Sequence, residues 1–299
     1  MRSLEAARWL PAVLIMSGPT SGTMQTMPTT PSVDQTGTIT AQVRPHHHGM
    51  TAAAHTAAHT PPEPFKVTNI HFETNASACD MGIQIKFDTE GLTAGSIKDP
   101  NGRMIYALRS SGGMKATGGQ TEGFLEAVEP QITELVSALG CAPSTEEGTS
   151  SLDDLFKAFP AGDYTFSGQA KGTKLGGKAT LTHLIPAGPD IVAPTPGMVV
   201  PDAPLLIDWD PVTDAILPSL GPVNIVGYHV IVEEAGAEVT PELDVDLPAT
   251  ETSVTVPAEY LKPSTVYRFE VLSTEEGGNQ TISEGFFCTV GVASCVVPE

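Results

Sequence analysis

The stretch Leu261-Lys262-Pro263-Ser264-Thr265-Val266-Tyr267-Arg268-Phe269-Glu270-Val271 decides the fold of the C-terminal third of this chain. Its second half alternates apolar and polar residues, as a half-buried β-strand does. Other short strands with turn residues between them are predicted on either side of it, at residues 205–211, 225–232, 253–257 and 285–290. Short alternating strands at this spacing indicate a β-sandwich.

The pattern Leu261-x-Pro263-x-x-x-Tyr267 resembles the tyrosine corner of the fibronectin type III family, in which the phenol bonds back to the preceding backbone. Trp209 is similar to the core tryptophan on the second strand of that family. The resemblance covers about residues 190–290 and implies an immunoglobulin-like β-sandwich. The structural residues that it implies are Trp209, Tyr228, Leu261, Pro263 and Tyr267.

Residues 65–188 predict a second β-rich region that resembles no family we can name. Its alternating segments are 65–72, 82–88, 103–108, 164–168 and 179–184, and Asp99-Pro100-Asn101-Gly102 is a strong turn signal. A helical insertion is predicted between them, because apolar residues recur at three- and four-residue steps from Phe124 to Leu139. Ser151 is a cap-like start for a second short helix over 152–159. The expected fold class is therefore all-β with a short helical insertion.

The expected domain organisation follows from changes in composition along the chain. We predict a signal peptide at 1–20, a disordered leader rich in Thr, Pro and His at 21–64, the β-rich domain at 65–188, the type III-like domain at 189–291 and a tail at 292–299. Six prolines between Pro186 and Pro204 predict a stiff, extended spacer between the two domains.

The chain is strongly acidic, with a formal net charge of −20. Residues 189–299 hold 18 acidic residues but only Lys262 and Arg268 as basic ones. An acidic surface repels nucleic acid and anionic membranes, so we expect neither as a partner, and we expect a basic partner rather than an acidic one. No segment outside the N-terminus approaches the ~20 apolar residues that a membrane-spanning helix needs.

Four cysteines, Cys79, Cys141, Cys288 and Cys295, have no spacing that matches a zinc site. In an exported protein an even number of cysteines suggests disulfides. Four cysteines can pair in three ways, and the simplest joins 79 with 141 and 288 with 295, one bond per domain. Four buried free thiols are the alternative. The apolar run Trp9 to Met16, between basic residues and small residues, resembles a signal peptide. The expected location is therefore either secreted or in the periplasm or cell envelope.

Histidines crowd one segment of the predicted leader: His46, His47, His48, His55 and His59. Imidazoles on a flexible chain bind Cu(II), Ni(II) or Zn(II), and the alternative is a compositional tract without a metal function. Asp208-x-Asp210 and Asp244-x-Asp246 each place two carboxylates on one side of a strand, where calcium could bind. Asn75-Ala76-Ser77 and Asn279-Gln280-Thr281 fit glycosylation acceptors.

The sequence contains no nucleophile elbow, dinucleotide fingerprint or phosphate loop, so we expect no enzyme and no cofactor. The leading hypothesis is a secreted or cell-envelope protein whose type III-like module binds a protein or a glycan. The first alternative is an exported metal-binding protein that uses the histidines between His46 and His59. The second alternative is a hydrolase of unrecognised type with an accessory type III domain.

Overall fold

The computed structural model describes residues 60–144, 148–201, 203–236 and 242–297. The predicted signal peptide, almost all of the predicted leader and the histidines from His46 to His59 lie outside them. Within the described residues the fold is mostly β, as predicted, and two hydrophobic cores lie in it. One core is formed by residues between Ile70 and Ile185 together with Ile216, and the other by residues between Val200 and Phe287. We call the two parts of the fold around these cores the N-module and the C-module.

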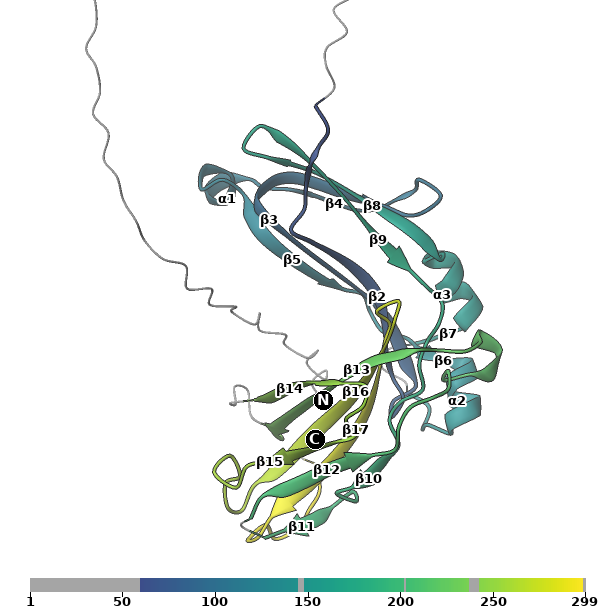
Figure 1. The fold of residues 1–299 in the computed structure, drawn as a ribbon, viewed down its shortest axis with the longest axis vertical. Helices are drawn as coiled ribbons and strands as arrows, with labels where there is room; N and C mark the ends of the chain where they lie inside the picture. Colours follow the sequence, from purple (N-terminus) through teal and green to yellow (C-terminus); the bar gives the residue numbers. More distant parts are fainter. Residues whose placement is uncertain (1–59, 145–147, 202, 237–241, 298–299) are drawn as a thin grey trace, which may run out of the picture. The chain divides into compact units, whose positions relative to one another are not determined.

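The C-module is a β-sandwich with the strand order of a fibronectin type III-like fold (Figure 1). One sheet has the order β10-β12-β15, formed by Ile191–Ala193, Leu205–Trp209 and Ser253–Val256. The facing strands follow the order β17-β16-β13-β14, with β11 beside β17. They are Gln280–Thr289, Val266–Glu275, Ile225–Glu234, Leu243–Pro248 and, for β11, Met198–Val200.

The N-module is built around the 19-residue strand β3, Asp80–Lys98. Its first half, up to Asp88, lies between β2 and β5, and its second half, from Leu92 onward, lies between β4 and β8. The register breaks near Gly91, whose φ of 119° is open to glycine but strained for other residues. The further strands are β1 (Glu63–Pro64), β2 (Val67–Asn75), β4 (Met104–Arg109), β5 (Gln120–Glu126), β6 (Gln131–Ile132), β7 (Thr149–Ser150), β8 (Gly162–Ala170) and β9 (Thr173–Leu181).

Three α-helices and one 3₁₀ helix are found among the described residues: α1 (Gly112–Ala116), α2 (Thr133–Leu139), α3 (Leu152–Ala158) and η1 (Pro218–Leu220). The helix predicted from Ser151 is present as α3, and the Ser151 side chain accepts a hydrogen bond from the backbone N–H of Asp154. The helical interpretation of Phe124 and Val128 is wrong. Phe124 lies in strand β5 opposite Lys86, and Val128 lies between elements, so only the C-terminal part of that apolar pattern, in α2, is helical.

The two modules share one sheet, because β2 of the N-module pairs with β17 of the C-module in parallel. Glu73, Thr74 and Asn75 lie opposite Gln280, Thr281 and Ile282, and the sheet continues as β8-β3-β2-β17-β16-β13 (Figure 1). The predicted stiff spacer is therefore not observed. Residues 191–193 and 198–200 of the proline-rich segment are strands of the sandwich, and Val200 is buried in its core. The domain boundary at 188/189 stays a prediction.

Asn279 joins the two modules at this junction. Its side chain is fully buried, and its Oδ1 accepts a hydrogen bond from the N–H of Phe72 at 2.8 Å. Its Nδ2 donates to the hydroxyl of Thr182 and to the carbonyl of Leu184, both at 2.8 Å. A side chain bonded in this way has no access to a glycosylating enzyme, so the acceptor interpretation of Asn279 is wrong for the folded protein.

Candidate functional site

The shared sheet has one apolar side and one polar side, as the alternation of side chains along each strand dictates. The two cores cover the apolar side, where Phe72, Ile85, Val230 and Phe269 are buried. The opposite side, which we call the polar face, extends over β14, β13, β16, β17, β2, the first half of β3 and β5. Besides its polar side chains it holds two buried apolar residues beside the junction, Leu272 and Ile282. It carries His71, Glu73, Gln84, Lys86, Glu122, Glu126, His229, Glu233, Asp244, Arg268, Glu270, Gln280 and Glu284.

Three carboxylates meet on this face in the N-module: Glu73 of β2, Glu126 of β5 and Glu129 of the following segment. Each offers one oxygen, and these oxygens all lie within 4.8 Å of one another. Gln84 of β3 lies between two of them, because its Nε2 donates to Glu73 Oε1 at 2.6 Å and to Glu126 Oε1 at 3.1 Å. We call Glu73, Glu126 and Glu129 the carboxylate cluster.

The backbone of β3 leaves room for the third carboxylate. Gly82 lies opposite Glu73 in the strand register, and a Cβ placed on Gly82 would come within 2.6 Å of Glu129 Cγ. The Glu129 side chain therefore occupies the space that any larger residue at position 82 would fill. The position of the cluster depends on this glycine.

Burial controls the charge of this part of the face. It raises the pKa of Glu73 to about 8, and the carboxylates of Glu126 and Glu270 add to that effect. Burial also raises the pKa of Glu126. The neighbouring His71 is buried as well, which lowers the pKa of its imidazole to about 4. Burial therefore favours the neutral forms of both the carboxyl groups and the imidazole. A bound cation would favour the ionised form of the carboxyl groups instead.

The C-module continues the acidic surface. Glu270 of β16 lies opposite Glu284 of β17, and burial together with Glu284 raises the pKa of Glu270 to about 7. Arg268 donates from Nε to Glu233 at 2.9 Å, so this guanidinium is already paired. At the edge of the sheet, His229 contacts the carboxylate of Asp244.

The structural residues expected from the type III resemblance lie in or beside the sandwich core. The ring of Trp209 is buried against Tyr228, with 5.3 Å between ring centroids, and the hydroxyl of Tyr228 accepts from the N–H of Val212. The hydroxyl of Tyr267 accepts from the N–H of Lys262 at 2.7 Å and donates to the carbonyl of Tyr260. Leu261 is buried and Pro263 is exposed in the turn before β16.

The structure contains the two predicted disulfides, Cys79 with Cys141 and Cys288 with Cys295. The alternative of four free thiols is therefore wrong for this structure. The aspartate pairs behave differently: neither Asp208 with Asp210 nor Asp244 with Asp246 belongs to a group of three potential metal ligands among the described residues. The histidines His46, His47, His48, His55 and His59 lie outside those residues.

The carboxylate cluster was missed in the sequence. Glu73 and Glu126 are 53 positions apart in the numbering, and only the pairing of β2 and β5 with β3 brings them together. The strand predicted at 65–72 ended one residue before Glu73, so the alternation did not place that residue. Strand β5 was read as part of a helix, and that interpretation hid the position of Glu126.

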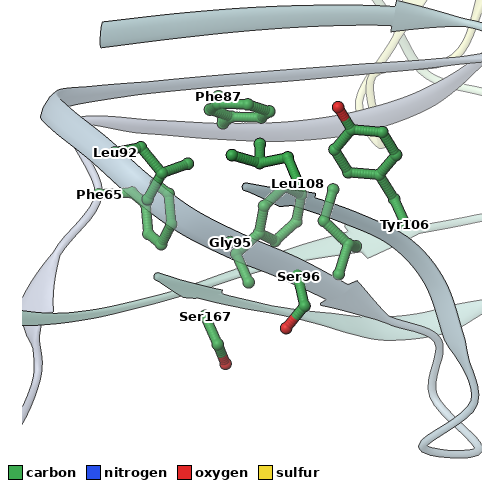
Figure 2. Close-up of a pocket in the computed structure, with 10 residues that line it drawn as sticks. Phe65, Phe87, Leu92, Gly95, Ser96, Tyr106, Leu108 and Ser167 are labelled. Atoms are coloured by element: carbon green, nitrogen blue, oxygen red, sulfur yellow. The ribbon is translucent and has the colours of Figure 1, made fainter. Parts of the chain in front are cut away.

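A second feature of the N-module is a small apolar hollow beneath β3 and β4. Figure 2 shows Phe65, Phe87, Leu92 and Leu108 around it. Its volume is about 10 Å³, which is room for no more than one water molecule. The rings of Phe65 and Phe87 meet edge to face with centroids 6.4 Å apart, so this hollow is part of the packed core.

The chain matches no protein-family model and no curated protein. Solved structures that match this chain include one described as a myokine, at 16% identity over 36% of this chain and 96% of that chain, with a TM-score of 0.25. The FN5 domain of Drosophila Lar is 18% identical over 36% of this chain and 99% of that chain, with a TM-score of 0.25. The FN1–FN3 domains of chicken CNTN1 are 11% identical over 76% of this chain and 65% of that chain, with a TM-score of 0.28.

The type III-like description of the C-module therefore rests on features of this chain: its strand order and the hydroxyl bonds of Tyr267. No helix among the described residues is long and apolar enough to cross a membrane.

Proposed function

We propose that this chain is a non-enzymatic, exported interaction protein that binds a basic segment of another protein on its polar face. The observation that carries the proposal is the continuity of that face across both modules through the pairing of β2 with β17. A partner that lies along the sheet meets carboxylates from β5 to β14 on one connected surface. The two disulfides support export, because such bonds persist in oxidising compartments.

Charge favours a basic partner. In the strands of the polar face, counting β3 only as far as Asp88, the basic residues are Lys86 and Arg268, and Arg268 is paired with Glu233. Within the described part of the chain, no ion pair involves the exposed carboxylates Glu122 and Glu284, and Glu284 accepts a hydrogen bond from the side-chain amide of Asn75. Complementary charge speeds association and excludes acidic partners.

The test uses a ten-residue lysine peptide and the full chain at physiological salt. In the face variant, Glu122→Gln, Glu270→Gln and Glu284→Gln are combined, which leaves the carboxylate cluster intact. The control variant combines Asp210→Asn, Glu251→Gln and Glu259→Gln, which removes the same charge from exposed positions beside β12 and β15, in the other sheet. Charges beyond ~8 Å are screened under these conditions, so the location of the charges should matter more than their number.

Biolayer interferometry with immobilised peptide should show that the face variant binds at least about tenfold more weakly than the wild type, while the control variant changes affinity less than about threefold. Equal loss in both variants would mean that the peptide responds only to net charge. That result would contradict the proposal.

A further inference from the structure

The carboxylate cluster contains a buried oxygen without a partner. Glu73 is only 5% exposed, and its Oε2 makes no hydrogen bond. Gln280, opposite Glu73 on β17, also has a buried side-chain oxygen without a hydrogen bond. Buried polar atoms are nearly always satisfied in folded proteins, and an orphaned carboxylate oxygen commonly marks the position of an ion or a water molecule.

The spacing of the cluster fits a particular kind of ion. Calcium takes oxygen ligands at about 2.3–2.6 Å, so two ligands on opposite sides of the ion lie about 4.6–5.2 Å apart. The oxygens of Glu73, Glu126 and Glu129, all within 4.8 Å of one another, are close enough to share such an ion. The amide oxygen of Gln280 is an uncharged ligand of the type that calcium also accepts.

We propose that Glu73, Glu126 and Glu129 bind a calcium ion on the polar face. Binding compensates the burial of the carboxylates, because a dication stabilises their ionised form where desolvation opposes it. Magnesium fits less well, since it demands a regular octahedron at about 2.0–2.1 Å and keeps several waters, for which the buried side chain of Glu73 leaves little access. The site is a property of the isolated chain and does not require the proposed basic partner.

The histidines from His46 to His59 do not interfere with the test. Calcium is a hard cation that prefers oxygen ligands, whereas imidazoles bind softer metals such as copper, nickel and zinc. The full chain can therefore be used, after treatment with EDTA and removal of the chelator.

Isothermal titration calorimetry with CaCl₂ at pH 7.5 should show one site in the wild-type chain. Glu126→Gln and Glu129→Gln should each weaken calcium binding at least about tenfold, because each removes a charged ligand. Glu122→Gln, on the same strand as Glu126 but outside the cluster, should leave the affinity unchanged. Gly82→Ala should also weaken binding without a change in charge, because the added methyl group displaces Glu129.

The thermal midpoint provides a second readout that also reports whether each variant folds. Calcium at 5 mM should raise the Tm of the wild type and of Glu122→Gln, but not that of the cluster variants. Absence of both heat and stabilisation in the wild type would overturn the proposal, and so would equal calcium affinity in Glu126→Gln, Glu129→Gln and the wild type. Magnesium binding as tight as calcium binding would overturn the assignment to calcium.

Discussion

Glu270 shows how a single carboxyl on the polar face affects stability. Its folded pKa of about 7 is raised by burial and by Glu284, whereas an unfolded chain has the ordinary value of about 4.5. A carboxyl with a raised folded pKa stabilises the fold fully below its unfolded pKa, and this stability is lost as the pH rises through the folded value. Glu270 therefore favours folding at pH 4 and opposes it at pH 8.

We expect Glu270→Gln to raise the free energy of unfolding at pH 8 by about 2 kcal/mol, since each pKa unit corresponds to about 1.4 kcal/mol and the partial exposure of the side chain screens part of the effect. At pH 4 the variant and the wild type should be equally stable. Urea unfolding in EDTA at both pH values measures this, with the exposed Glu251→Gln as the control. A variant that is equally stable at pH 8 would show that Glu270 is solvated and ionised without cost.

At the same scale, the sequence identified the core residues of the C-module better than the polar ones. Trp209 and Tyr267 were found because the size and spacing of aromatic residues in a sandwich core form a local pattern. Glu73 and Gln84 could not be found in this way. A buried polar residue looks like any other polar position in an alternating strand, and only the neighbouring strands determine its burial.

Among the elements, the junction of β2 with β17 depends on Asn279. We expect Asn279→Ala to lower the free energy of unfolding by at least about 3 kcal/mol, because it leaves the Phe72 N–H and the Leu184 carbonyl buried without partners. Differential scanning calorimetry measures the loss. Asn101→Ala, at an exposed turn, is the matched control and should change stability little. An equally small effect at both positions would mean that water replaces the Asn279 contacts.

Strand β5 explains why one element was predicted wrongly. Phe124 and Val128 continue the three- and four-residue spacing of α2 toward the N-terminus, but Pro130 separates them from that helix. The helical spacing between these two residues and α2 therefore does not indicate one continuous helix. Residues 120–126 instead pair with β3, and a short apolar segment takes the structure that its tertiary partner offers. The alternation predicted the larger part of β13 and β16, but only residues 82–88 of β3 and residues 164–168 of β8.

For the whole molecule, composition was a poor guide to how the modules are joined. Prolines between Pro186 and Pro204 suggested a spacer, but proline is also tolerated at the ends and edges of strands, and here the segment contributes β10 and β11. The pairing of β2 with β17 joins residues about 200 positions apart, and no local pattern contains that information. The continuous polar face, on which the proposed function depends, is a consequence of that pairing.

The most direct test of the shared sheet is residue-specific hydrogen exchange in the full chain, followed by NMR. The N–H of Phe72 donates to Asn279 Oδ1 and the N–H of Ala76 donates to the carbonyl of Ile282, so both amides are protected by bonds across the junction. We expect both to exchange as slowly as amides in the centre of the β13–β16 pair, through global unfolding. Exchange of Phe72 and Ala76 within seconds, while the β13–β16 amides stay protected, would show two modules that move independently and would contradict the account.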